Sequence, residues 1–214
     1  MITVYGRPDS SAVARLMWTI CELDLPHKRI DAGGSFGGLD EPAYLAMNPA
    51  GAIPSVVLAD GRTLWESNAI IRYLCAEHSL GGLCPADAVM RAQAEAWMDW
   101  ASAFGRAVGA IRHAYRAKGA TMGDGLAAVD VAALVIAILD HRLADGRSFV
   151  MGEALTIADL SLGVIAHRLT RCPEGLNTAR FGAIFAWYAR LALRPAFQTH
   201  VVACVSAGPQ RVGG

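Results

Sequence analysis

The chain has 214 residues, of which 18% are charged, and its formal net charge at neutral pH is zero. This length is enough for one large domain or two small ones with a substantial buried core. A neutral chain without a basic run argues against nucleic acid as a partner, and it lacks the charge repulsion that keeps protein molecules apart, so self-association is expected.

The N-terminus and the apolar segments predict a cytoplasmic protein with no membrane partner. Residues 1–7 have neither the basic start nor the apolar run of a signal peptide. The longest strongly apolar run, residues 131–139, is far shorter than the roughly 20 residues that span a bilayer. We therefore expect a buried core helix at this run.

The cysteines and histidines form no recognisable metal-binding pattern. The five cysteines include no Cys-x-x-Cys, and the six histidines include no His-Glu-x-x-His. Cys21 and Cys75 lie on helical patterns among apolar residues, which predicts small buried thiols in a reducing compartment. No metal site is expected.

The first 79 residues alternate short strand patterns with helical patterns, which predicts an α/β domain. A βαβ unit is followed by a short helix capped by Asp40, then a hairpin with its turn at residues 60–61, then a closing helix. This order predicts a mixed sheet in which a parallel pair is extended by an antiparallel hairpin. The expected strands are residues 2–5, 27–31, 55–58 and 63–65, and the expected helices include residues 12–23 and 67–77.

The pattern changes after residue 79. Residues 80–85 read as a linker, and residues 86–214 read almost entirely as helix, so we expect a second, all-helical domain there. Its predicted helices are residues 86–118, 126–143, 157–168 and 181–192, with a terminal piece after Pro195. Within it, Thr156 and Asp159 have the spacing of a capping box, with Leu155 and Leu160 as its hydrophobic staple.

The first candidate binding segment is residues 48–58. A proline at the start of a strand, here Pro54, withholds an N–H group from the sheet. If the bond before Pro54 is cis, the peptide at Ile53 turns outward and can pair with an extended peptide ligand. The alternative from the residues alone is a simple strand cap.

The second candidate segment is residues 65–70, where a strand ends and a helix begins. Ser67 suits a position at the helix start, where free N–H groups and the helix dipole form an anion site. Glu66 beside it suits a ligand ammonium group. A cation and an anion on one carbon describe the head group of an amino acid.

The third candidate segment is the turn Asp9-Ser10-Ser11 between the first strand and the first helix. Hydroxyl and N–H groups at a helix N-terminus can stabilise a thiolate. Ordinary helix caps would have the same residues, so the turn is informative only in combination with the other two segments. The glycines at 33–38 predict a loop, and they lack the strand–turn–helix context of a dinucleotide site.

Two segments, in this order along the chain, resemble the glutathione-binding region of cytosolic glutathione S-transferases. They are Asn48-Pro-x-Gly-x-x-Pro54 and Trp65-Glu-Ser-Asn-Ala-Ile-x-Arg-Tyr-Leu74. Similarity continues at Gly6-Arg7 with Ser10, at residues 33–37 and at residues 95–100, which resemble a bacterial serine-type subgroup, theta- or nu-like. The resemblance covers the whole chain, because residues 155–160 resemble the capping motif of the family's helical domain.

The resemblance implies a thioredoxin-like N-terminal domain with a cis Pro54, and a homodimeric transferase that uses glutathione as co-substrate in detoxification or in a dedicated metabolic step. Ile53 would pair with the cysteinyl part of glutathione. Glu66 and Ser67 would hold the γ-glutamyl amine and carboxylate, and Asn68 would assist at the helix start.

The sequence leaves open whether Ser10 or Ser11 activates the thiol. The tyrosine or cysteine that other family members place near this turn is absent here, because Tyr5 lies inside the strand. Ser10 fits the subgroup motif and is ranked slightly ahead, whereas Ser11 is better spaced from Arg15 for the serine-type classes.

The electrophile is expected to lie against the helical domain, with Arg112, His113 and Tyr115 as candidates for the wall of its site. A solvated helix face is the alternative for these three residues. Two other functions also stay open: a glutathione-dependent disulfide reductase or peroxidase on the same fold, and a non-catalytic binding module. The Glu66–Ser67 pair argues against the latter, since a scaffold does not need an amino-acid site.

Overall fold

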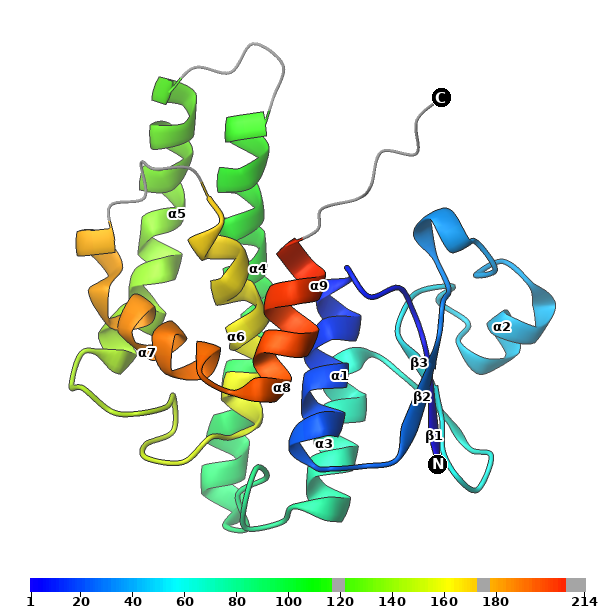
Figure 1. Cartoon of the computed structure of the whole chain (residues 1–214). Coiled ribbons are helices and arrows are strands. Elements are labelled where there is room, and N and C mark those ends of the chain that lie inside the picture. Colours follow the sequence, from blue (N-terminus) through cyan, green and yellow to red (C-terminus); the bar gives the residue numbers. More distant parts are fainter. Residues whose placement is uncertain (117–121, 173–177, 207–214) are drawn as a thin grey trace. The chain divides into compact units, whose positions relative to one another are not determined.

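The computed structural model describes residues 1–116, 122–172 and 178–206. The chain divides into two compact units, one made of residues 1–84 with the segment that begins at Pro195, and one made of residues 85–194. Figure 1 shows the elements of both units along the chain. No helix in the described part of the chain is long and apolar enough to cross a membrane.

The first unit is built on a four-stranded mixed sheet with the strand order β2-β1-β3-β4. Strand β1 pairs in parallel with β2 and antiparallel with β3, and β3 pairs antiparallel with β4. The predicted mixed sheet is therefore confirmed. The strands are β1 Ile2–Tyr5, β2 His27–Ile30, β3 Ser55–Val57 and β4 Thr63–Trp65.

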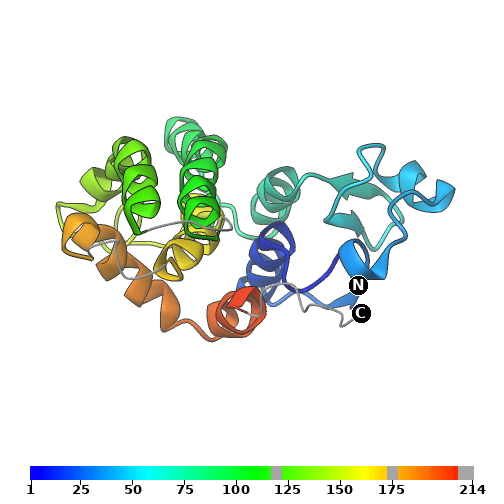
Figure 2. The ribbon, with the colours of Figure 1, turned by 90° about the horizontal axis from the view of Figure 1, so that it is seen from above.

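Helices cover both faces of this sheet. Helices α1 (Ser11–Glu22) and α3 (Ser67–His78) pack side by side on one face, and α2 (Pro42–Met47) lies on the other (Figures 1 and 2). Helix α1 buries the predicted apolar side, which includes Val13, Leu16 and Ile20. An apolar stripe at helical spacing thus seats α1 on the sheet.

The start of α2 differs by one residue from the prediction. Glu41, not Asp40, is the N-cap, and its side chain makes no capping hydrogen bond. Pro42 occupies the first turn, where a missing N–H and a fixed φ are well tolerated. Because a proline disfavours helical geometry in the residue before it, Glu41 is held in the extended region and the helix begins after it.

The segment from Pro195 packs against α1. It consists of α8 (Pro195–Phe197), a π-helical turn at Gln198–Val202 and α9 (Ala203–Ser206). The ring of buried Phe197 meets the ring of buried Trp18 edge-on at 4.7 Å between centroids. These contacts group the segment with the first unit, whereas the sequence pattern assigned residues 86–214 to one helical domain.

The second unit is helical, as predicted. Helix α6 lies at its centre, and nearly all its side chains are buried. Helix α4 packs against α5 and α6, and α7 packs against the same two helices. Because α6 is surrounded, it has no polar face and only weak amphipathic periodicity. The helices are α4 Ala88–Arg116, α5 Met122–Leu143, α6 Ile157–Thr170 and α7 Gly182–Ala192.

The predicted capping box at the start of α6 is formed. Oδ2 of the fully buried Asp159 accepts hydrogen bonds from the backbone N–H of Thr156 at 2.9 Å and from its hydroxyl at 3.2 Å. Oδ1 of the same carboxylate accepts from the N–H of Val150 and from Nε1 of Trp187, each at 2.9 Å. The box therefore also ties α6 to the preceding loop and to α7.

Candidate functional site

Strand register brings the three candidate segments to one edge of the sheet. Tyr5, the last residue of β1, pairs with Ser55, the first residue of β3. Ser55 also pairs with Trp65, the last residue of β4. The turn that follows β1, the Ile53–Pro54 loop and the start of α3 therefore extend from three neighbouring strand ends.

The peptide bond between Ile53 and Pro54 is cis, as the family resemblance implied. Among the described residues, neither the N–H nor the C=O of Ile53 forms a hydrogen bond. The Ile53 side chain packs on Gly6, since an ideal Cβ added to Gly6 would lie 3.4 Å from Cβ of Ile53. That same Cβ would lie 2.4 Å from Cγ2 of Val13, so only glycine fits at position 6.

A buried hydrogen-bond network supports the loop before Pro54. Nδ2 of Asn48 donates to the carbonyl of Ala52 at 2.7 Å and to Oγ of Ser55 at 3.1 Å, and its Oδ1 accepts from the N–H of Ala50. The Tyr44 hydroxyl donates to the same Ala52 carbonyl at 2.7 Å. Asn48 is only 1% exposed. The asparagine of the Asn-Pro motif therefore shapes this loop through buried hydrogen bonds.

Glu66 adopts a left-handed backbone conformation, with φ 67°, at the N-cap of α3. A non-glycine residue in this region costs free energy, and such residues gather at functional sites. Its carboxylate is exposed and has no partner among the described residues. The first helical hydrogen bond runs from Ile70 to the carbonyl of Glu66, and backbone N–H groups at such a helix start can bind an anion.

Ser67 and Asn68 lie in this first turn, as predicted. Ser67 is the first helical residue and is buried. Oδ1 of Asn68 accepts from Nη1 of Arg15 at 3.1 Å, which joins the start of α3 to α1. Asn68 is thus already engaged with α1, while Glu66 and Ser67 lie together at the start of α3, where the sequence pattern places a head-group site.

The two serines at the start of α1 differ in their surroundings. Ser10 is the N-cap of α1, and its Oγ accepts from the N–H of Val13 at 3.5 Å. That bond uses the oxygen as acceptor and leaves the hydroxyl proton free to be donated. Oγ of Ser11 is buried and has no hydrogen-bond partner in the structure. Both serines thus keep a hydroxyl proton for an incoming sulfur, and the ranking of Ser10 ahead of Ser11 stays a prediction.

Arg7 was not among the predicted binding residues, although it belongs to the resembling Gly6-Arg7 pair. Its Nη1 donates to the two carboxylate oxygens of Asp9 at 3.1 and 3.0 Å. Its side chain lies against the glycine loop, which we define as residues 33–38. No local pattern links position 7 to position 34, so this contact needed the folded chain.

Arg112, His113 and Tyr115, the predicted wall of the electrophile site, lie near the end of α4. Arg112 is half-buried, and burial together with the charges of Arg171 and Arg112 lowers the pKa of His167 to about 4. Arg112 thus lies near the buried His167. His113 is exposed, and the side chain of Tyr115 lies outside the described residues. Their role at the electrophile site stays a prediction.

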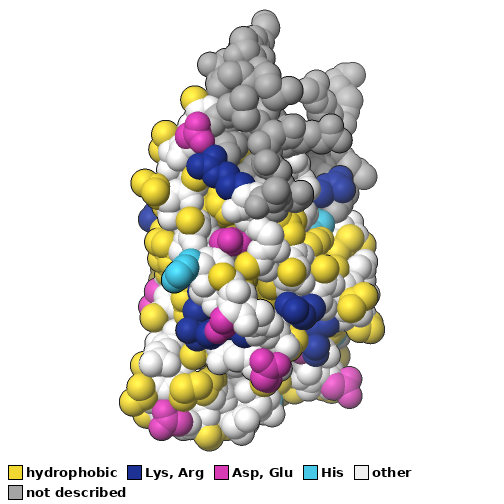
Figure 3. Space-filling view, turned by 90° about the vertical axis from the view of Figure 1, so that its left-hand side faces the viewer, with side chains coloured by type: hydrophobic (Ala, Val, Ile, Leu, Met, Phe, Trp, Pro, Cys, Tyr) yellow, Lys and Arg dark blue, Asp and Glu magenta, His cyan; other side chains and the backbone are white. Residues whose placement is uncertain are grey.

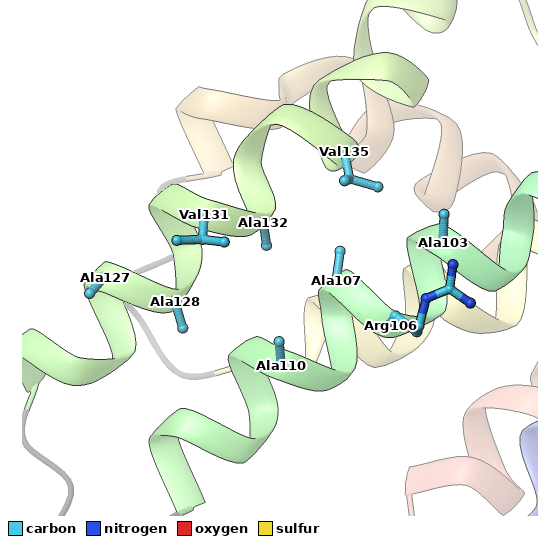
Figure 4. Close-up of a pocket in the computed structure, with 9 residues that line it drawn as sticks. All are labelled: Ala103, Arg106, Ala107, Ala110, Ala127, Ala128, Val131, Ala132 and Val135. Atoms are coloured by element: carbon cyan, nitrogen blue, oxygen red, sulfur yellow. The ribbon is translucent and has the colours of Figure 1, made fainter.

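The helical unit instead has an apolar groove of about 570 Å³ between α4 and α5. Figure 4 shows small side chains from both helices pointing into this space. The groove is lined by Ala103, Arg106, Ala107, Ala110, Ala127, Ala128, Val131, Ala132 and Val135. Figure 3 views the side that carries α5 and α7, and shows hydrophobic side chains in patches between basic ones. Arg112 and His113 are not among the described residues that line this groove.

No group of three histidine, cysteine or acidic side chains is placed to hold a metal ion within residues 1–116, 122–172 and 178–206. All five cysteines are free thiols. Burial, with a smaller contribution from Cys84, raises the pKa of Cys75 to about 12, so this thiol is protonated and inert at neutral pH.

Two family models match the chain. The model described as glutathione S-transferase, N-terminal domain, matches residues 9–77, and the model described as glutathione S-transferase, C-terminal domain, matches residues 92–190. The glutathione S-transferase GstB of Escherichia coli strain K12 is 34% identical over 96% of this chain and 100% of its own length. Glutathione S-transferase 3 of Zea mays is 29% identical over 94% of each chain.

This chain is also similar to a solved structure of a glutathione S-transferase. The theta class glutathione S-transferase of Xanthomonas axonopodis pv. citri, crystallised with glutathione bound, superposes with a TM-score of 0.81. It is 32% identical in sequence, over 95% of this chain and 98% of the other. The similarity thus extends over both units of the fold.

Proposed function

The chain belongs to the glutathione S-transferase family, and we propose that it activates the thiol of glutathione as a thiolate for attack on a small hydrophobic electrophile. The observation that carries this proposal is the arrangement at the sheet edge, where the left-handed Glu66 and the first turn of α3 lie beside the cis Ile53–Pro54 loop. A relative that resembles this chain over its full length was crystallised with glutathione.

The chain's own residues account for binding of the tripeptide. The Glu66 carboxylate would hold the γ-glutamyl ammonium, and Ser67 with the N–H groups around it would hold the γ-glutamyl carboxylate. The unpaired N–H and C=O of Ile53 would pair with the cysteinyl backbone as an added strand. This binding would place the cysteinyl sulfur near the N-terminus of α1.

Activation of the sulfur is assigned to Ser10, with Ser11 as the alternative. A free thiol has a pKa of about 8.5, so only a few per cent is thiolate at neutral pH. One hydrogen bond to a charged group contributes roughly 1.5–3 kcal/mol, which corresponds to a fall in pKa of roughly one to two units. A lower pKa would reduce nucleophilicity, so one hydroxyl is sufficient.

The proposed function is tested by calorimetric titration with glutathione, followed by assays with aryl halides, haloacids, hydroperoxides and mixed disulfides. We expect binding at or below millimolar glutathione, and turnover of at least one electrophile by conjugation. Failure to bind at millimolar glutathione would defeat the proposal. Turnover of disulfides or hydroperoxides alone would replace conjugation by reductase or peroxidase chemistry on the same site.

The active molecule is proposed to be a cytoplasmic homodimer. The free thiols of all five cysteines fit a reducing compartment. Helix α5 carries Val131 and Leu134, each 80% exposed, beside the groove that it forms with α4. Exposed apolar side chains in a row on a neutral chain favour contact with a second copy.

A further inference from the structure

Glutathione carries a second carboxylate, on its glycine, for which the assignments above provide no partner. From Ala32 to Gly61 the sequence contains no lysine, arginine or histidine, although this stretch includes the glycine loop, α2 and the loop before Pro54. Its ionisable acids are Asp40, Glu41 and Asp60. A cation of the first unit that binds the glycyl carboxylate would therefore come from outside this stretch.

Arg7 brings a guanidinium to this region. An ideal Cβ added to Gly34 would lie 3.0 Å from Cδ and 3.1 Å from Nε of Arg7, so the side chain rests directly on the backbone of the glycine loop. The neighbouring Gly33 lies against Ile53, with an ideal Cβ 3.4 Å from Cδ1 of that residue. Arg7 therefore lies against Gly34, and the adjacent Gly33 lies against Ile53, whose backbone is assigned to the cysteinyl part of glutathione.

The guanidinium of Arg7 is only partly used within the protein. Asp9 occupies Nη1 alone, through contacts of 3.1 and 3.0 Å. Nε is buried and has no hydrogen-bond partner in the structure. Nε and Nη2 form the edge of a guanidinium that matches a carboxylate through two parallel hydrogen bonds. A buried donor without an acceptor is unfavourable, so an acceptor that reaches this edge is favoured.

Two neighbouring arginines are committed to structural contacts. Nη1 of Arg29 donates to the carbonyl of Gly6 at 2.7 Å and also pairs with Asp31. Nη1 of Arg15 donates to Asn68 at the start of α3. Both contacts hold backbone or helix ends in place. Arg7 is the arginine that combines contact with the glycine loop and an unused carboxylate-binding edge.

We propose that Arg7 recognises the glycyl carboxylate of glutathione and thereby sets the specificity of this chain for the complete tripeptide. The inference rests on the proposed function, and it adds a specificity-determining residue to it. Asp9 fixes the far end of the guanidinium and the glycine loop fixes its face, so the free edge is preorganised. Glycine suits position 34 because its φ is 61° and because a Cβ there would crowd the Arg7 side chain.

The test compares two ligands, glutathione and its glycyl monoethyl ester, in which an uncharged ethyl ester replaces the glycyl carboxylate. Wild-type protein and Arg7→Gln are titrated with both by calorimetry. We expect wild type to prefer glutathione by about 10- to 100-fold, the range of a charge-assisted pair of hydrogen bonds. Arg7→Gln should lose this preference because glutathione binding weakens while ester binding is unchanged.

Arg62→Gln is the matched control. Arg62 forms the same kind of ion pair with an aspartate two residues away, Asp60, but its side chain is 72% exposed and lies on the hairpin turn. The Arg62→Gln variant should bind both glutathione and the ester with unchanged affinity. Arg7→Lys keeps the charge without the planar fork and should retain part of the preference, so it decides the question if Arg7→Gln does not fold.

Each outcome has a distinct meaning. Equal weakening of both ligands by Arg7→Gln, or an intact preference in that variant, would overturn the assignment, since Arg7 would then hold the turn or play no part. Equal binding of the two ligands by wild type would also overturn it, while leaving the proposed function standing. Binding of neither ligand by wild type would instead refute the proposed function itself.

Discussion

At the scale of single residues, the site depends on where hydroxyl and charged groups stand at helix ends. Ser10 and Ser11 are adjacent in sequence, yet one is the N-cap of α1 and the other has a buried hydroxyl without a partner. A buried hydroxyl without a partner is unfavourable, so Ser11 would also gain from an incoming acceptor. The two serines therefore differ in the hydrogen bonds that they already make.

We predict that Ser10→Ala raises the pKa of the bound glutathione thiol by roughly one unit or more, because the thiolate loses a charge-assisted hydrogen bond. The ultraviolet absorbance of the thiolate, titrated against pH in the complex, measures this shift. Ser11→Ala is the control and should leave the titration in place. A shift in Ser11→Ala alone would move the activating role to Ser11.

Glu66 gives a second prediction at this scale, because its left-handed backbone disfavours any residue with a Cβ. Glu66→Gly and Glu66→Ala both remove the carboxylate, so both should weaken glutathione binding by a similar factor. Glu66→Gly should be the more stable of the two by about 1 kcal/mol in urea unfolding. Equal stability of the two variants would contradict strain at this position.

At the scale of elements, α6 and α7 are joined by a buried histidine. His167 on α6 is 2% exposed, and its Nδ1 lies 2.8 Å from the hydroxyl of Tyr188 on α7. Burial is the main cause that lowers its pKa to about 4, and the nearby arginines add to it. The folded protein therefore keeps this imidazole neutral through mildly acidic pH.

The folded protein should therefore become less stable as the pH is lowered. Between about pH 6.5 and pH 4 the unfolded chain takes up a proton at His167 and the folded chain does not, so the free energy of unfolding should drop as pH is lowered, by up to about 3 kcal/mol in total. Urea unfolding of wild type and His167→Gln across this window measures the difference. The exposed His113→Gln is the control. An unchanged slope in His167→Gln would contradict the prediction.

At the scale of the whole molecule, the proposed homodimer gives the main prediction. Leu134→Glu places a charge on the exposed apolar side of α5 and should convert the dimer to monomer in light scattering, without loss of helical circular dichroism. Leu193→Glu changes a residue that is 83% exposed elsewhere in the helical unit, and it should remain dimeric. A dimeric Leu134→Glu variant would exclude this side of α5 as the contact surface.

The agreement between prediction and structure has a physical basis. Periodicity, turn residues and capping patterns act over a few neighbouring residues, which is why the mixed sheet, the helices and the Thr156–Asp159 box could be predicted. The cis bond at Pro54 followed from the family resemblance rather than from local pattern. The position of the α2 cap was missed by one residue, because Pro42 fixes the geometry of Glu41.

The sequence by itself determined which elements form, the family, and the candidate residues for the amino-acid head group, because all of these depend on local spacing. Only the tertiary structure decided that Arg7 lies on Gly34 and that Phe197 packs on Trp18. These are contacts between residues distant in the chain. They are selected by packing and burial in the folded protein, which no short pattern encodes.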